Sequence, residues 1–322
     1  MTRDFDLLIL TIERDVEKLV FGMPLLRRYL APQRTVFIAP AACLRSLERE
    51  GIPREGDLSL NEDGILEGLT VALVRDLLRS RGSDAGRAGW YFKQLAIFAY
   101  AARPEAADHY LVWDADTLPL REMSFFDSDG RVVFDVAPDL HAPYFETMKT
   151  MIGIERQVDY SFISDHMMLE KEIALALIDR IIGSEVPSGE ALARRALASI
   201  SDRALVGGSG FSEYETYGSF VAANFPGRFV ARKSSRTRMG SSFFGLPPSV
   251  SGLFALSREY AWANFESPTT TDRRPSRRLK SAAYRAFGLA WAVAVVVLHP
   301  RAFAAYRRSV PELRRKKSRR RL

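Results

Sequence analysis

Two aspartates separated by one residue, Asp114 and Asp116, directly follow the apolar run Tyr-Leu-Val-Trp at residues 110–113. Alternate residues of an extended segment point to the same side, so both carboxylates can converge on one cation. Carboxylate oxygens suit hard divalent ions, and a Mg²⁺ site of one or two carboxylates usually leaves room for substrate phosphates. The pair therefore predicts a Mg²⁺ or Mn²⁺ site that holds a phosphate or diphosphate. An Asx-type turn that closes the strand is the alternative interpretation.

Other candidates for the same substrate lie elsewhere in the chain. Trp90, Lys93 and Gln94 stand close together upstream of the acids, where Lys93 can meet a diphosphate. Thr11 opens a loop that can hold a nucleoside. His166 can supply a third metal ligand or contact an acceptor sugar. An ordinary helical lysine, aromatic core packing and a hydrogen-bonded histidine are the respective alternatives.

A second acidic cluster supplies candidates for acid–base chemistry. Ser212 and Glu215 have the S-x-x-E spacing of a capping box, which explains Glu215 as a residue that orders a helix start. Glu213 is not needed for the cap and is available as a general base, although compensation of the helix dipole also explains it. Asp165 is the other candidate base. The glycine-rich residues 207–210 predict a mobile loop able to fold over a substrate.

The elements that must position these residues alternate between strand and helix patterns. Expected strands cover residues 5–11, 35–39, 110–113, 131–136, 160–169 and 229–231, and expected helices cover 41–50, 143–154 and 170–182, with further helices beginning near Asn61 and Trp90. This alternation predicts an α/β fold with an open, mostly parallel sheet flanked by helices. Ligands of such sheets bind outside the carboxyl ends of the strands, so loop 11–15 and Asp114 should share one edge.

Charge divides the chain into two parts. Residues 272–322 contain sixteen Lys or Arg and two acids, which gives a net charge of +14. Because the whole chain has a net charge of +7, residues 1–271 have a net charge of −7. We expect a catalytic domain over 1–268, a linker over 269–281 and a basic tail over 282–322. The single cysteine, Cys43, excludes an intramolecular disulfide and a Cys-based zinc cluster. Acids near the N-terminus argue against an export signal, which favours a cytoplasmic location.

The tail contains an uncharged, mainly apolar run at residues 286–298, flanked by Arg285 and Arg301. As a helix this run would be about 20 Å long, short of the ~30 Å hydrocarbon core of a bilayer. We therefore expect a monotopic anchor on the anionic inner face of the plasma membrane. A helix packed on the catalytic domain, with a disordered basic end, is the alternative.

Four segments in this order resemble bacterial GT-A-type glycosyltransferases, and more closely an uncharacterised glycosyltransferase-like family of polysaccharide-locus proteins. The segments are residues 89–94, 112–121, 161–168 and 211–218, and the resemblance covers about residues 5–266. It implies a GT-A-like fold in which Asp114 and Asp116 hold a divalent metal against a nucleotide-sugar donor. The acceptor would be a glycan or a lipid-linked sugar of surface polysaccharide synthesis.

Two other classes of function are compatible with parts of the sequence. Two acids that hold Mg²⁺ against phosphates also suit a nucleotidyltransferase or a phosphohydrolase, although no P-loop or Gly-rich nucleotidyl motif is present. A protein that binds nucleic acid through its basic tail would leave the internal acids unexplained. We therefore expect an enzyme and no nucleic-acid partner.

Overall fold

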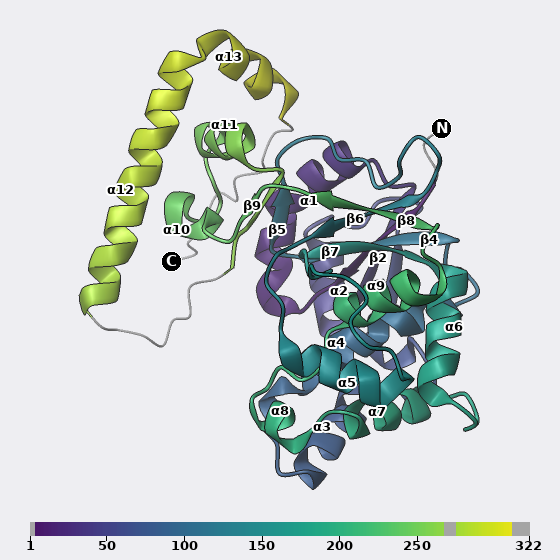
Figure 1. The fold of residues 1–322 in the computed structure, drawn as a ribbon. Helices are drawn as coiled ribbons and strands as arrows, with labels where there is room; N and C mark the ends of the chain where they lie inside the picture. The colour runs from purple at the N-terminus through teal and green to yellow at the C-terminus, as the bar shows by residue number, and fades with distance from the viewer. Residues whose placement is uncertain (1–3, 267–274, 311–322) are drawn as a thin grey trace.

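The computed structural model describes residues 4–266 and 275–310. Its centre is a five-stranded sheet of order β3-β2-β1-β4-β7, in which β7 runs antiparallel to β4 and the other pairs are parallel (Figure 1). The strands are β1 (Asp6–Leu10), β2 (Arg34–Ala39), β3 (Leu58–Asn61), β4 (His109–Trp113) and β7 (His166–Glu170). The predicted open, mostly parallel α/β sheet is therefore confirmed.

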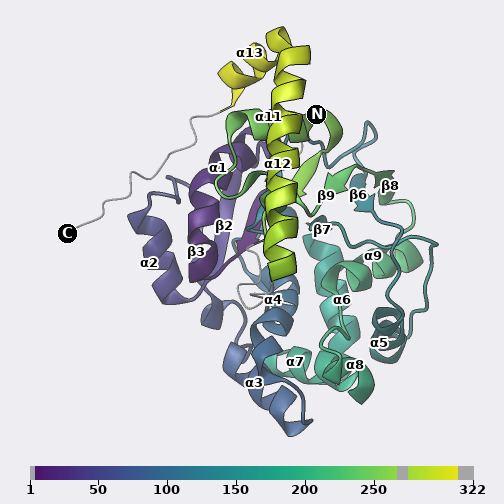
Figure 2. The same ribbon diagram turned by 90° about the vertical axis from the view of Figure 1, so that its left-hand side faces the viewer.

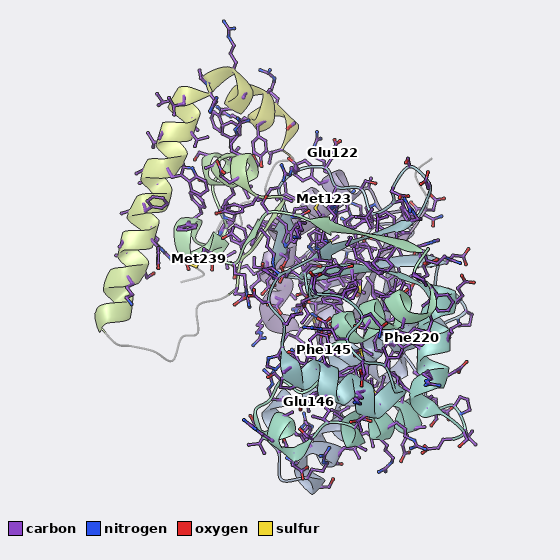
Figure 3. All side chains as sticks on the ribbon, in the orientation of Figure 1. Glu122, Met123, Phe145, Glu146, Phe220 and Met239 are labelled. Carbon is purple, nitrogen blue, oxygen red and sulfur yellow. The ribbon has the colours of Figure 1, made fainter. Side chains whose placement is uncertain are left out.

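Helices surround this sheet, and side chains fill the space between the layers (Figure 3). The helices of this part are α1 (Val16–Leu30), α2 (Ala41–Arg49), α3 (Val71–Ser80), α4 (Ala88–Ala99), α5 (Ala142–Ile152), α6 (Lys171–Ile182), α7 (Gly189–Ala198), α8 (Asp202–Val206) and α9 (Glu213–Asn224). Every residue of β1 and β7 is buried. Burial of consecutive residues means that both faces of these strands are covered, which explains why they are apolar runs rather than alternating patterns.

The order of the strands places a topological switch point between β1 and β4, and we call the carboxyl edge of the sheet at this point the crevice. The chain leaves β1 towards β2 on one side and later returns as β4 on the other side. At such a switch point the connections after two neighbouring strands diverge and leave an opening at the carboxyl edge. The short 3₁₀ helix Glu13–Asp15 follows β1, and Asp114 follows β4. Lys18 contacts both Asp15 and Asp116, so the predicted common edge is confirmed.

Two sequence predictions for individual elements are wrong. Asn61 does not begin a long helix: it ends β3 and caps a single 3₁₀ turn, and α3 starts only at Val71. Gly68, with a left-handed φ of +80°, redirects the chain between them. The expected strand over 160–169 is reduced to β7, because Asp165 also takes a left-handed conformation, with φ of 68°.

A second group of elements lies beside this sheet and combines strands from residues 117–136 with the strands and helices that follow Arg228. It contains a three-stranded sheet of order β5-β10-β9, and β6 pairs with β8 next to it. The elements are β5 (Thr117–Pro119), β6 (Val132–Val136), β8 (Phe229–Lys233), β9 (Arg236–Thr237), β10 (Trp262–Asn264), α10 (Gly240–Phe244), α11 (Val250–Glu259), α12 (Pro275–Leu298) and α13 (Pro300–Ser309). Helices α10 and α11 lie between α12 and the rest of the molecule (Figures 1 and 2).

The tail helix is longer than the sequence run predicted. Helix α12 is continuous over 24 residues and begins inside the expected linker, whose residues up to 274 lie outside the described part of the chain. Within it, Lys280–Leu298 is long and apolar enough to cross a membrane, by length and composition alone. The predicted helix length of about 20 Å is therefore wrong, because the charged residues before 286 extend the helix instead of ending it.

Candidate active site

The two predicted metal ligands directly follow β4 at the carboxyl edge of the sheet. The Thr117 amide donates to the Asp114 carbonyl (3.0 Å), so a backbone turn closes the strand and leaves both carboxylates to other partners. The side chains of Asp114 and Asp116 are 27% and 26% exposed. Asp114 forms an ion pair with Lys93 of α4, and Asp116 lies 3.5 Å from the Nζ of Lys18. Each acid therefore has a lysine partner.

Lys18 was not among the residues that the sequence indicated. It lies in the first turn of α1, is only 7% exposed, and donates to Asp15 at 2.8 Å. A charged ammonium is rarely buried unless it is paired. Its sequence signal is weak: a lysine between the apolar residues Val16 and Leu19. Only the approach of β1 to β4 brings it to Asp116.

Lys93 is placed as predicted, beside the acids. Burial alone would lower its pKa, but the charges of Asp114, Glu213 and Asp116 outweigh burial and raise the pKa above its ordinary value. Lys93 therefore stays protonated at physiological pH. A cation fixed at this position can meet a diphosphate as a point charge.

Glu213 is the acid that the fold brings to this group. It begins α9, is 8% exposed, and its amide donates to the Oε1 of Gln94 at 3.2 Å. Burial and the charge of Asp114 raise the pKa of Glu213 to about 7, against the opposing charge of Lys93. Gln94 thus acts by holding the start of α9. A carboxyl group with this pKa can exchange a proton near neutral pH.

Glu215 and Ser212 form only half of the predicted capping box. The Ser212 hydroxyl accepts a hydrogen bond from the Glu215 amide at 3.3 Å, which confirms the cap. The Glu215 carboxylate does not complete the box: it accepts from the Ser161 hydroxyl at 2.6 Å, deep in the core. Glu215 therefore attaches α9 to the segment before β7 and takes no direct place among the acids.

Asp165 is engaged by other residues. Its carboxylate forms an ion pair with Arg236 and accepts a hydrogen bond from the Trp262 indole at 3.0 Å. Burial would raise its pKa, but the Arg236 charge and these hydrogen bonds lower it below the ordinary value. A carboxylate held in this way is a weak base. Its carbonyl accepts from the Asp114 amide at 3.2 Å, so Asp165 positions the first acid.

His166 does not join the two acids. It is buried, stacks on Trp113 with ring centroids 4.6 Å apart, and its Nε2 lies 2.9 Å from an Asp135 oxygen. Within residues 4–266 and 275–310, no group of three His, Cys, Asp or Glu side chains could hold a metal ion. The role predicted for His166 as a third ligand is therefore not supported. Its pairing across the β4–β7 ladder turns its ring into the core.

The remaining predictions concern Thr11, Trp90 and the loop at residues 207–210. The Thr11 amide donates to the Ile38 carbonyl at 3.0 Å, and its hydroxyl has no partner among the described residues. The face of Trp90 is covered by the Arg87 guanidinium at 4.3 Å. The predicted mobile loop is fastened: Arg87 donates to the Gly208 carbonyl and Thr147 donates to that of Gly210. A freely moving lid at 207–210 is therefore not supported.

One further group near the acids was missed. Tyr214 is 5% exposed, and its hydroxyl has no hydrogen-bond partner within the described ranges. Burial and the charges of Asp114, Glu213 and Asp165 raise its pKa well above the ordinary value. It therefore remains a neutral hydroxyl within the electrostatic influence of the acids. Its neighbour Glu213 was the only sequence signal for this position.

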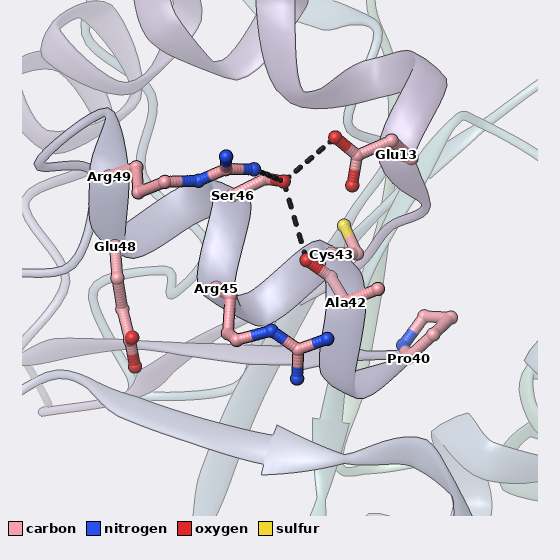
Figure 4. A pocket seen from close by; sticks show the side chains of 8 residues that line it. All are labelled: Glu13, Pro40, Ala42, Cys43, Arg45, Ser46, Glu48 and Arg49. Atoms are coloured by element: carbon pink, nitrogen blue, oxygen red, sulfur yellow. Dashed lines mark hydrogen bonds between the residues drawn. The ribbon is translucent and has the colours of Figure 1, made fainter.

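A pocket of about 610 Å³ lies at the same edge of the sheet, between the turn after β1 and helix α2 (Figure 4). The Ser46 hydroxyl donates to Glu13 at 2.8 Å and accepts from Arg49 at 2.7 Å across this pocket. Its size falls within the range of small-molecule sites. Glu13 belongs to the same 3₁₀ turn, Glu13–Asp15, as Asp15, the partner of Lys18.

No protein-family model matches the chain, and no curated protein matches its sequence. Three solved structures are similar to this chain at low sequence identity. Mouse xyloside xylosyltransferase 1, in its apo form, is 11% identical with a TM-score of 0.40 over 84% of this chain and 100% of that chain. Core-mannan synthase A from Aspergillus fumigatus, in a Mn/GDP form, is 10% identical with a TM-score of 0.41 over 71% and 72%.

The third is galactosyltransferase LgtC in complex with donor and acceptor sugar analogues, which is 12% identical with a TM-score of 0.33 over 89% of this chain and 96% of that chain.

Proposed function

We propose that this protein is a metal-dependent glycosyltransferase, which moves a sugar from a nucleotide-diphosphate donor to a hydroxyl of a glycan or lipid-linked acceptor. One observation carries the proposal: at the switch point of the sheet, two half-buried acids, two paired lysines and a buried glutamate with a pKa of about 7 lie together. Transfer from a diphosphate donor needs a site for the diphosphate, compensation of its charge and a proton acceptor.

The donor atoms present fit a divalent ion. Asp114 and Asp116 offer carboxylate oxygens that are about a quarter exposed, and Mg²⁺ or Mn²⁺ bound by two carboxylates takes its other ligands from phosphates and water. When bound, such an ion neutralises charge on the leaving diphosphate. The backbone of the two acids is held in place by Asp165 and by the turn at Thr117.

The two lysines have different tasks in this proposal. Lys93 stands between Asp114 and Glu213, so a diphosphate that approaches the acids meets its ammonium group. Lys18 is more deeply buried and bridges Asp15 and Asp116, which fixes the second acid relative to the turn after β1. The pocket lined by Glu13 and Ser46 shares the 3₁₀ turn Glu13–Asp15 with the partner of Lys18 and is our choice for the nucleoside.

Glu213 is the preferred base if transfer inverts the anomeric centre. A base works best when its pKa is near the working pH, and Glu213 meets this condition with a pKa of about 7. The two other candidates are occupied: Asp165 by Arg236 and Trp262, and Glu215 by Ser161. The ordered motifs that resemble polysaccharide-locus proteins suggest surface polysaccharide synthesis as the setting.

The deciding experiment incubates the full-length protein with a panel of nucleotide sugars and Mn²⁺, and measures the free nucleotide that is released. Release of nucleoside diphosphate supports sugar transfer. Release of pyrophosphate or inorganic phosphate would instead indicate a nucleotidyltransferase or a phosphohydrolase and would overturn the proposal. Asp116→Asn should abolish release, whereas Asp129→Asn, which changes an exposed acid outside the crevice, should not.

A further inference from the structure

Helix α12 has one face packed on the molecule. A Cβ on Gly288 would lie 2.4 Å from the Phe243 carbonyl oxygen, so only glycine allows α10 to approach this closely. Ala292, one turn later, is 2% exposed. The Trp291 ring lies 6.1 Å and 5.9 Å from the rings of Phe243 and Phe244, measured between centroids. This face of α12 is packed against α10, as the alternative prediction of a helix packed on the catalytic domain requires.

The opposite face of α12 is apolar and uncovered. Leu289, Val293 and Val297 repeat every four residues, which places them in one stripe along the helix. They are 67%, 55% and 70% exposed. We call this stripe the outer face. Figure 2 views the molecule from the side on which α12 stands in front of the other elements. Large exposed apolar patches mark interaction sites rather than ordinary surface.

The charges around the outer face have one sign. Residues 280–310 contain five Lys or Arg and no Asp or Glu, and the stretch between Arg285 and Arg301 contains no Lys, Arg, Asp or Glu. Arg301, Arg307 and Arg308 are exposed on α13, which continues from the end of α12. An apolar stripe with cations at its ends matches a surface that is apolar inside and anionic at its boundary.

We propose that the outer face binds in the plane of an anionic lipid bilayer, with the arginines of α13 at the headgroups. A second copy of this chain is a poorer occupant, because face-to-face packing would bring two wholly basic segments together. A membrane-spanning helix would have to give up the contacts of Gly288, Trp291 and Ala292. This inference is independent of the proposed function.

Vesicle sedimentation of the full-length protein tests the proposal. Binding is expected with vesicles containing anionic lipid, and it should weaken as salt rises from ~0.1 M to ~1 M, since screening shortens from ~10 Å to ~3 Å. The double variant Val293→Ser with Val297→Ser should lose about tenfold or more in vesicle affinity because it removes buried apolar area. Wild-type binding by this variant, or no binding by the native chain, would overturn the proposal.

The chain offers a matched control. Val186→Ser with Val206→Ser makes the same chemical change at residues that are 84% and 71% exposed but lie away from α12. This variant should bind vesicles like the native chain. Equal loss of binding in both variants would show that the outer face has no special role. If the native chain instead forms a dimer that only the α12 variant disrupts, a second copy is the partner and the proposal fails.

Depth measurements separate in-plane binding from spanning. Spin labels at cysteines replacing Ala290 and Val297, in a Cys43→Ser background, report their depth in the bilayer. An in-plane helix places both labels at a similar depth of about 5–10 Å. A helix that crosses would separate them by about 10 Å, given a rise of ~1.5 Å per residue. Similar shallow depths support the proposal, and a graded depth overturns it.

Discussion

Replacing Glu213 by glutamine should remove sugar transfer while making the protein more stable at alkaline pH. Glutamine keeps the shape of the side chain but cannot accept a proton. Loss of a general base typically costs about 10²–10⁴ in rate, which is ~3–5 kcal/mol of transition-state stabilisation. The native kcat/KM should rise with pH up to about 7, the pKa of Glu213, and then level off.

The stability effect follows from the same burial. The pKa of Glu213 rises from 4.5 to about 7 on folding, so the folded state keeps a proton that the unfolded chain has lost. Stability that this group contributes is complete below pH 4.5 and is lost as the pH rises through 7. The rise of the Glu213 pKa from 4.5 to about 7 corresponds to ~3 kcal/mol of folding stability. The Glu213→Gln variant would not lose stability in this way at high pH, because glutamine does not titrate.

Urea unfolding of both proteins at pH 5 and pH 8, in metal-free buffer, measures this difference. The stability of Glu213→Gln relative to the native protein should increase by up to about 3 kcal/mol between the two pH values. Glu146→Gln, at an exposed residue of α5 marked in Figure 3, should show no such change. A difference that stays constant with pH would refute the burial argument, and retained transfer would move the base to another residue.

Three further predictions concern the acids, Lys93 and the tail. Asp116→Ala should cut turnover by at least ~10², or about 3 kcal/mol, in a nucleotide-release assay, and near-native turnover in the folded variant would exclude the metal role. Lys93→Met should raise the KM for the sugar donor about tenfold or more, and an unchanged KM would separate Lys93 from the diphosphate. Deleting residues 275–322 should lower the free energy of unfolding by about 3 kcal/mol or more, because it uncovers Phe243 and Phe244 of α10. Native-like stability of the truncated chain in urea would show that the tail is dispensable for folding.

The strands at the centre of the fold could be predicted because their sequence pattern is local. Residues 110–113 are apolar without interruption, and burial on both faces of β4 is what such a run requires. The shared edge of loop 11–15 and Asp114 could then be predicted from the alternation of strands and helices, whereas the strand order could not. Left-handed residues were harder to predict: Gly68 and Asp165 each interrupt a segment that periodicity alone would have made one element. Both depend on backbone conformation, which hydrophobic patterning does not describe.

In the candidate site, too, short sequence spacings could be predicted, and contacts between residues far apart in the chain could not. The spacing of Asp114 and Asp116 is a property of three residues, and the Ser212 cap on Glu215 is a property of four, so both were visible in the chain. The pairing of Asp116 with Lys18 joins residues about a hundred positions apart. No periodicity reports such a pair, because it exists only when β1 and β4 lie side by side.

The same distinction decides the roles of the three candidate bases. Sequence spacing left Glu213, Glu215 and Asp165 equivalent apart from the cap, since each is a carboxylate near the motifs. In the folded chain, Asp165 is paired with the Arg236 guanidinium and accepts a hydrogen bond from the Trp262 indole. Glu215 accepts a hydrogen bond from the Ser161 hydroxyl. Glu213 is buried near Lys93 and Asp114. Proton affinity in a protein depends on these partners rather than on residue type. Glu213 is therefore the residue whose environment, and not its position in a motif, suits it to exchange a proton at neutral pH.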